Sequence, residues 1–118
     1  MKEFVPKLSK DLFLSKVEIE KELVEGNKSN ENLYKLILKA ENFLRDGRSG
    51  AIISKRLPIY KYFEEKFSIT NLFLFDLSGE ARAFYTNTSR DEFEILQIIL
   101  EVHETHKEYE KKGGYNRH

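Results

Sequence analysis

Cysteine and tryptophan are absent from this chain of 118 residues, and methionine occurs only once. Without cysteine there is no disulfide framework, no thiolate nucleophile and no thiolate metal site. This absence excludes the enzyme classes and metal-binding modules that depend on a thiol, so any chemistry must come from other side chains.

An excess of charge and a long hydrophobic run are also missing. The 20 Lys and Arg residues balance the 20 Asp and Glu residues. A neutral chain does not hold nucleic acid by bulk positive charge, so a site for a polyanion must consist of a few placed cations. No uncharged apolar stretch reaches the roughly 20 residues that span a bilayer, and residues 1–6 lack the apolar core of a signal peptide. We therefore expect a cytoplasmic protein without a membrane partner.

What the chain does contain is typical of one folded domain. Hydrophobic residues make up 40% of the sequence and charged residues 34%. The length has room for one hydrophobic core. We predict a single domain over residues 1–118.

The first half of the chain predicts a short edge strand and two helices. A brief alternation with a proline indicates a strand over residues 4–8. Ser9 is a suitable N-cap for a helix that ends at Gly26, and Gly47 marks the end of a second helix. Apolar residues of that second helix follow the i, i+3, i+4, i+7 spacing: Leu33, Leu36, Ile37, Ala40, Phe43 and Leu44. Two such helices joined by a polar turn form an αα-hairpin that needs a common apolar surface.

The second half predicts the sheet that supplies this surface. Residues 47–58 are expected to form a loop or short extended segment, and residues 60–67 a short helix. Strands are predicted over residues 71–77, 81–88 and 93–102, with a turn at 78–80, and a last short helix begins at Thr105 and ends at Gly113. The fold class is therefore α+β, with the αα-hairpin on one face of a small twisted antiparallel sheet. We expect the other sheet face to be open to a ligand, and the strand over 93–102 to have one better buried face.

Three stretches in this order resemble the RelE/ParE superfamily of small toxins. They are Lys55–Pro58, then Asn71–Phe73 continuing to Arg82–Thr86, and then His106–Tyr109 running to Gly114-Tyr115. The resemblance follows the whole chain in element order and about half of it in motif. It implies a RelE-like fold and, for the ribonuclease branch, cleavage of mRNA on the ribosome without a metal or another cofactor.

The resemblance also implies site residues. It assigns catalysis to Arg82, His106, Tyr109 and Tyr85, and binding of substrate phosphate to Lys55, Arg56 and Lys107. Such cleavage needs a base for the 2′-hydroxyl proton, cations for the phosphate and an acid for the leaving oxygen. Basic and aromatic side chains can fill these roles.

Arg82 is the first candidate, because a guanidinium can hold two phosphate oxygens at once. Lys55 and Arg56 form a cation pair in the loop before the sheet. The alternatives are a solvated cross-strand arginine and two cations that serve only solubility.

The aromatic and imidazole candidates carry alternatives too. His106 near a helix N-terminus is suited to act as a base, or it is a solvent-facing helix residue. Tyr109 and Tyr85 can stack on bases or carry a proton, or they pack in the core. In an unbroken strand Arg82 and Tyr85 point to opposite faces unless a bulge intervenes. His103 is expected to be partly exposed, and no metal site is convincing.

Three functions remain open at this point. The first is a toxin of a toxin-antitoxin pair that acts as a ribosome-dependent mRNA endonuclease, with a cognate antitoxin, the ribosome and mRNA as partners. The second is a binding-only relative, either ParE-like or inactive, that acts by protein-protein contact. The third is an unrelated interaction module with the same α+β plan.

Overall fold

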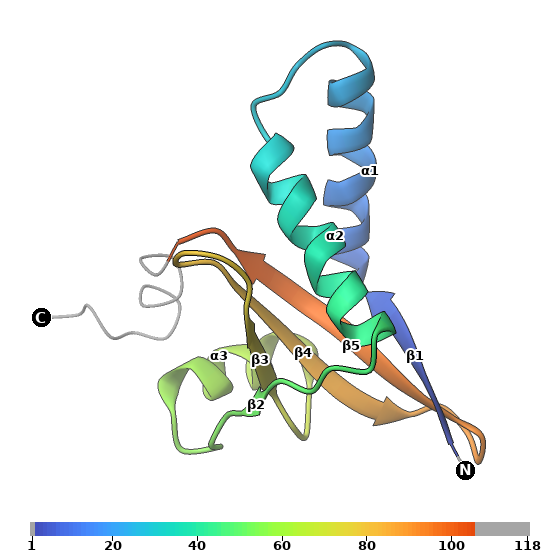
Figure 1. Cartoon of the computed structure of the whole chain (residues 1–118). Helices are drawn as coiled ribbons and strands as arrows, with labels where there is room; N and C mark the ends of the chain where they lie inside the picture. The colour runs from blue at the N-terminus through green and yellow to red at the C-terminus, as the bar shows by residue number, and fades with distance from the viewer. Residues whose placement is uncertain (1, 106–118) are drawn as a thin grey trace, which may run out of the picture.

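The computed structural model describes residues 2–105, and the segment that holds His106, Lys107, Tyr109 and the expected last helix lies outside them. Three helices and five strands are arranged as an α+β fold, as the sequence predicts (Figure 1). In chain order they are β1 (Glu3–Leu8), α1 (Lys10–Val24), α2 (Glu31–Arg45), β2 (Ala51–Ile52), α3 (Pro58–Phe67), β3 (Phe73–Asp76), β4 (Arg82–Ser89) and β5 (Glu94–His103).

The two long helices form the predicted αα-hairpin. Ser9 caps α1, since its Oγ accepts a hydrogen bond from the Leu12 N–H at 3.3 Å. The same hydroxyl donates to the Leu100 carbonyl at 2.8 Å, so the cap also ties α1 to β5. Gly26 follows the end of α1 with a φ of +85°, a conformation that glycine adopts without strain.

The five strands form one sheet in the order β1-β5-β4-β3-β2. The pairs β2·β3, β3·β4 and β4·β5 are antiparallel, whereas β1 runs parallel to β5, with Glu3 opposite Glu94. The expectation of a wholly antiparallel sheet is therefore wrong at this edge. Because the αα-hairpin separates β1 from the rest of the sheet, no tight turn dictates its direction.

A hairpin joins β3 to β4, and an irregularity interrupts β4·β5. The hairpin turn around Gly79 is closed by the Leu77 N–H, which donates to the Ala81 carbonyl at 3.0 Å. Phe84 pairs with Glu101, but Tyr85 pairs with Ile99, so β5 contains the extra residue. The bulge therefore leaves the alternation along β4 intact.

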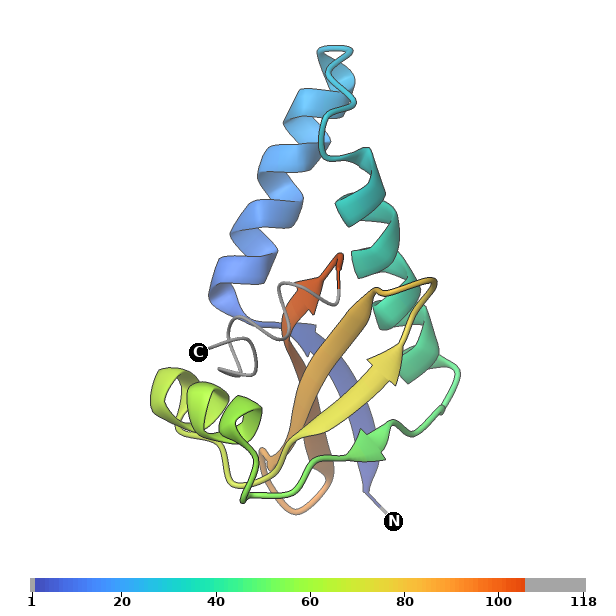
Figure 2. The same ribbon diagram turned by 90° about the vertical axis from the view of Figure 1, so that its left-hand side faces the viewer.

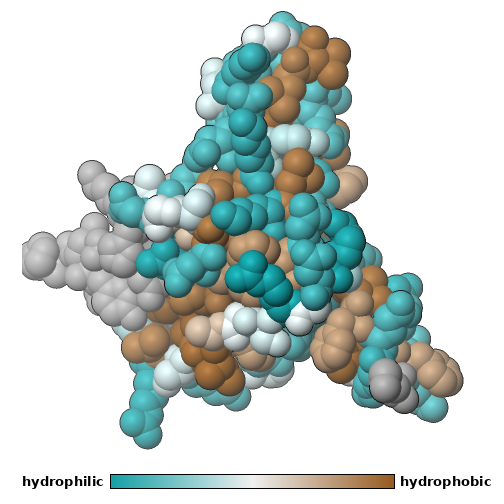
Figure 3. Space-filling model, viewed as in Figure 1, coloured by the Kyte–Doolittle hydropathy of each residue, from teal (hydrophilic) through white to brown (hydrophobic). Residues whose placement is uncertain are grey.

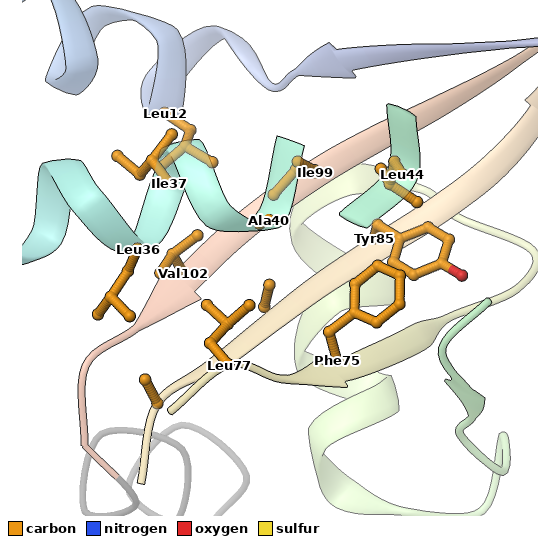
Figure 4. Packing of buried hydrophobic residues seen from close by; sticks show 12 residues of the cluster. Leu12, Leu36, Ile37, Ala40, Leu44, Phe75, Leu77, Tyr85, Ile99 and Val102 are labelled. Atoms are coloured by element: carbon orange, nitrogen blue, oxygen red, sulfur yellow. The ribbon is translucent and has the colours of Figure 1, made fainter. Parts of the chain in front are cut away.

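The αα-hairpin covers one face of the sheet and forms a mainly aliphatic core with it (Figure 4). The α2 residues Ile37 and Ala40 are fully buried, as the helical spacing predicts. They pack with Ile99 and Val102 of β5. Burial of this stripe holds the hairpin on the sheet.

The opposite face is covered by α3 instead of being open. Figure 2 shows α3 on one side of the sheet and α2 on the other. A second cluster of buried residues lies there: Ile53, Ile59, Tyr60, Phe63, Ile69, Leu72, Phe84 and Leu100. The expectation of an open sheet face is therefore wrong, and from Ile99 to His103 β5 is buried on both faces. The helix begins at Pro58, two residues before the predicted start, because proline is well suited to the first helical position.

Within residues 2–105, no helix is both long and apolar enough to cross a membrane.

Candidate functional site

Arg82 is the first residue of β4 and lies at the hairpin end of the sheet. Its Nε is 2.9 Å from the Asp76 Oδ1, and its Nη1 donates to the Glu80 carbonyl at 3.3 Å. The Arg82 side chain is 23% exposed and that of Asp76 79% exposed. This is a surface ion pair, which adds little to stability, so a phosphate can displace the carboxylate.

Lys55 and Arg56 lie far from Arg82, in the turn between β2 and α3. The Leu57 N–H closes this turn on the Ser54 carbonyl at 3.1 Å. Lys55 lines a hollow beside residues 70–72, just before β3 begins, whereas Asp76, the partner of Arg82, is the last residue of β3. At 3.3 Å per residue the separation is roughly 13 Å. The three cations predicted to share a phosphate site are therefore not brought together.

Tyr85 is a core residue on the face of the αα-hairpin. It is 2% exposed, and its ring stacks on those of Phe73 and Phe75, with centroids 5.2 and 5.0 Å away. Its hydroxyl accepts a hydrogen bond from the Gly50 N–H at 2.8 Å, and burial raises its pKa. Because the bulge is in β5, Tyr85 and Arg82 remain on opposite faces. The placement supports a structural role for Tyr85.

The remaining predicted site residues belong to the C-terminal segment. His106, Lys107 and Tyr109 lie outside the described residues, so their roles stay predictions.

A polar cluster lies on the α3 face, and the Glu101 carboxylate is its centre. Glu101 Oε2 accepts hydrogen bonds from the Tyr62 hydroxyl at 2.6 Å and from the Lys66 Nζ at 2.8 Å. Glu101 Oε1 is 2.7 Å from the Nε2 of His103. A single side chain thus contacts a phenol, an ammonium and an imidazole. We call these four residues the Glu101 cluster.

Two regular spacings assemble the Glu101 cluster. Glu101 and His103 are two residues apart in β5 and share a face, while Tyr62 and Lys66 are one turn apart in α3. Arg82 stands directly opposite His103 in the β4·β5 register, so its side chain emerges on the same face. The structure therefore places Arg82, the first candidate for the site, on the same sheet face as the Glu101 cluster.

His103 lies at the base of the cluster. It is 1% exposed, and its ring centroid is 5.0 Å from that of Phe84 and 6.3 Å from that of Phe63. The expectation that His103 is partly exposed is wrong, because α3 covers this end of β5. No hydrogen-bond partner reaches its Nδ1 from the described residues.

Hydrogen bonds to Glu101 and burial determine the protonation states of Lys66 and Tyr62. The hydrogen bond to Glu101 raises the pKa of Lys66. Burial, together with the hydrogen bond to Glu101, raises the pKa of Tyr62. Near neutral pH Lys66 is therefore a cation and Tyr62 a neutral phenol that donates to the carboxylate.

The cluster offers a proton acceptor, a proton donor and cations within one small region. Among residues 2–105, no group of three or more His, Asp and Glu side chains is placed to hold a metal ion. The arrangement is suited to proton transfer beside a bound anion.

Sequence reasoning missed three of the four cluster residues. It placed Glu101 on the more exposed face of its strand and did not single out Tyr62 or Lys66. One signal was available, since Glu101 and His103 interrupt an otherwise apolar strand end, Ile98-Ile99-Leu100-Glu101-Val102-His103. A charged residue in such a run is seldom buried without a partner.

Comparison with known protein families, with curated proteins and with solved structures finds no match for this chain.

Proposed function

We propose that this chain is the toxin of a toxin-antitoxin pair and that it cleaves mRNA on the ribosome without a metal ion. The observation that carries the proposal is the position of Arg82 opposite His103, beside the carboxylate of Glu101 and its two donors on α3. The αα-hairpin on a small sheet is also what the resemblance to the RelE branch implies. We propose in addition that the helices and strands have the RelE-like arrangement.

The chemistry follows from the groups present. Arg82 and Lys66 bind the scissile phosphate, and the phosphate replaces Asp76 on the guanidinium. The Tyr62 hydroxyl takes the 2′-hydroxyl proton while its own proton passes to Glu101, 2.6 Å away. The 2′-oxygen then bonds to phosphorus, the bond from phosphorus to the 5′-oxygen breaks, and a 2′,3′-cyclic phosphate forms.

The leaving 5′-oxygen needs a proton of its own. We assign that step to His106 or Tyr109, which the resemblance marks as catalytic. His103 is a positioning residue, because its buried ring holds Glu101 in place and does not reach the solvent.

The partners follow from the same proposal. A toxin requires a small antitoxin, encoded by an adjacent gene, that covers part of the toxin surface. Since α3 occupies the sheet face expected to be open, we place the antitoxin on the αα-hairpin. There α1 exposes Phe13 and Leu14, each 54% exposed, and Val24, 88% exposed. Coexpression of the neighbouring reading frame should restore growth, and a long unrelated gene at that position would count against the pair.

A binding-only domain is the second candidate. It is favoured by the ion pair between Arg82 and Asp76 and by the zero net charge, both of which weaken the hold on RNA. Such a domain acts by protein-protein contact and cuts nothing.

The discriminating experiment is induced expression, followed by primer-extension mapping of cuts in translated mRNA. We expect cuts with the native chain and a loss of about 100-fold or more with Glu101→Gln, because the amide cannot accept the proton. Glu94→Gln is the matched control in the same strand, where the carboxylate only pairs with Arg90 at 3.4 Å. Equal cutting by Glu101→Gln would refute the proton-acceptor role, and growth arrest without cuts would favour the binding-only domain.

A further inference from the structure

Helix α1 has a second apolar row, apart from its buried residues Leu12 and Ile19. Phe13, Val17 and Val24 are four and seven residues apart, so they lie along one side of the helix. Phe13 is 54% exposed and Val24 is 88% exposed. Figure 3 shows hydrophobic surface at the outer end of the αα-hairpin, on the side where α1 lies in Figure 1. An exposed apolar row on a helix that already packs in the core indicates a second contact.

A shallow hollow of about 330 Å³ interrupts this row. Its lining consists of five residues from the last turns of α1 and its C-cap: Val17, Glu20, Lys21, Val24 and Glu25. The hollow therefore lies on the helix surface and not inside the fold. Phe13 projects from the same row one turn before Val17. A single helix thus presents a knob and a hole of the kind that interlock in helix pairs.

Opposite charges lie at the two ends of the row. Lys10 is the first residue of α1 and Glu25 its C-cap, both are exposed, and neither forms an ion pair within residues 2–105. At about 100° of rotation per residue, the two side chains emerge on the same flank of the row. A two-fold axis between antiparallel helices sets each flank against the same flank of the partner. Lys10 of one copy is then near Glu25 of the second copy, whereas a parallel pair would align like charges.

One register satisfies both features. When Lys10 is level with Glu25 of the second copy, Phe13 is level with Glu22 of that copy, because the two chains run in opposite directions. Position 22 lies within the hollow that extends from Val17 to Glu25. The arrangement that pairs the cation with the anion therefore also places the knob in the hole.

We infer that two copies of this chain associate through α1 as an antiparallel, two-fold symmetric pair. Phe13 of each copy fills the hollow of the other, and Lys10 of each lies beside Glu25 of the other. A helix of 15 residues is about 22 Å long, so the contact is small and the dimer reversible. The proposed antitoxin would use the same surface and would separate the two copies. The inference does not rest on toxin activity, since it uses residues of α1 and its C-cap alone.

Sedimentation equilibrium of the full chain, from about 10 μM to about 1 mM, measures this association. We expect a monomer–dimer equilibrium that Phe13→Ser weakens about tenfold or more, because the knob is lost. Phe93→Ser is the matched control, since Phe93 is 70% exposed and lies just before β5. It should dimerise like the native chain. Thermal unfolding checks that both variants fold.

Exchange of the two charges tests the pairing itself. Lys10→Glu alone or Glu25→Lys alone should weaken the dimer several-fold, because each sets like charges against one another. The double variant Lys10→Glu/Glu25→Lys should restore native association. Each single change suits the helix dipole, so loss of the fold does not explain loss of the dimer.

The outcomes separate this inference from the proposed function. A chain that stays monomeric up to about 1 mM would overturn the inference, even if the chain cuts RNA or binds an antitoxin through α1. A dimer that is insensitive to Phe13→Ser, or that the double charge exchange does not restore, would place the interface elsewhere and overturn it too. A dimer with the expected responses, in a chain that never cuts RNA, would overturn only the cleavage proposal.

Discussion

The two faces of the sheet differ in what covers them. On the αα-hairpin face the core is mainly aliphatic, and its one buried phenol, Tyr85, has a hydrogen-bond partner. On the α3 face the core contains three buried aromatic rings, those of Tyr60, Phe63 and Phe84, and borders the Glu101 cluster. Both buried polar side-chain atoms without a partner in residues 2–105, the Tyr60 hydroxyl and the His103 Nδ1, lie on the α3 face.

This difference indicates a division of labour. Buried polar groups without partners cost stability, so a fold retains them where they serve another purpose. Both faces hold a buried core, and the α3 face in addition carries the groups that can do chemistry. Four tests can decide whether this division holds.

The largest effect should come from removing a central side chain of either face. Phe63→Ala should lower the free energy of unfolding by about 3–5 kcal/mol and Ile37→Ala by about 2–5 kcal/mol, since each leaves a cavity. Of these two residues, Phe63 contacts the His103 ring and Ile37 lies on the other face of the sheet. Denaturant unfolding measures both losses of stability. Cleavage per folded molecule should be lost in Phe63→Ala and retained in Ile37→Ala. Equal activity of the two variants would break the division.

Gly50→Ala should come next, with a loss of about 1–3 kcal/mol. A Cβ at this position would lie 2.6 Å from the Leu74 carbonyl oxygen and 3.0 Å from the Tyr85 ring. The backbone of β3 cannot move away without disturbing its pairing with β4. A melting temperature equal to that of the native chain would show that this approach is looser than the structure indicates.

Tyr85→Phe should cost about 1 kcal/mol, because the Gly50 N–H loses its acceptor. We expect the rate of RNA cleavage to stay unchanged, in contrast to the catalytic role that the resemblance gives Tyr85. Thermal unfolding and primer extension on the same preparation check both parts. A large loss of cutting with little loss of stability would return Tyr85 to the site.

Alkaline pH should weaken the α3 face by a smaller amount. The ordinary pKa values of Tyr62 and Lys66 are 10.0 and 10.5, and both are raised in the folded chain. Above about pH 10 the unfolded chain has released these protons while the folded chain still binds them, so stability falls as pH rises. Below that pH the contribution is fully present.

Melting temperatures between about pH 8 and about pH 11.5 measure this effect. Lys66→Met should lower the melting temperature at pH 8 and make the alkaline decline shallower, because the ammonium no longer pairs with Glu101. Lys61→Met, on an exposed position of the same helix, is the control. An identical pH profile for the native chain and Lys66→Met would contradict the assigned pairing.

Local sequence patterns were enough to predict most elements. The stripe of α2, the Ser9 cap and the turn at residues 78–80 each depend on neighbours within a few residues. The direction of β1 could not be predicted, because its partner lies about 90 residues away in the chain and no local pattern encodes that pairing. The position of α3 over the second face is also a long-range property, and it accounts for the errors on the open face and on His103.

The candidate site was predicted only in part. Arg82 was identified through the resemblance, and the structure places it on the face of the Glu101 cluster. The prediction that Arg82 lies beside Lys55 and Arg56 was wrong, because these cations lie near opposite ends of β3. The sequence alone does not show which end of a strand a separate loop approaches. Glu101 was overlooked because alternation was taken to mean exposure, whereas α3 buries that face as well.

Arg82→Ala tests the central claim most directly, with Arg90→Ala, just beyond the other end of β4, as the control. Both arginines form an ion pair with a nearby carboxylate, but only Arg82 stands opposite His103. In primer extension on mRNA being translated, we predict that Arg82→Ala loses about 100-fold or more of the native cutting and that Arg90→Ala cuts like the native chain. Equal cutting by both variants, with both folded, would contradict the claim that the α3 face acts on RNA phosphate.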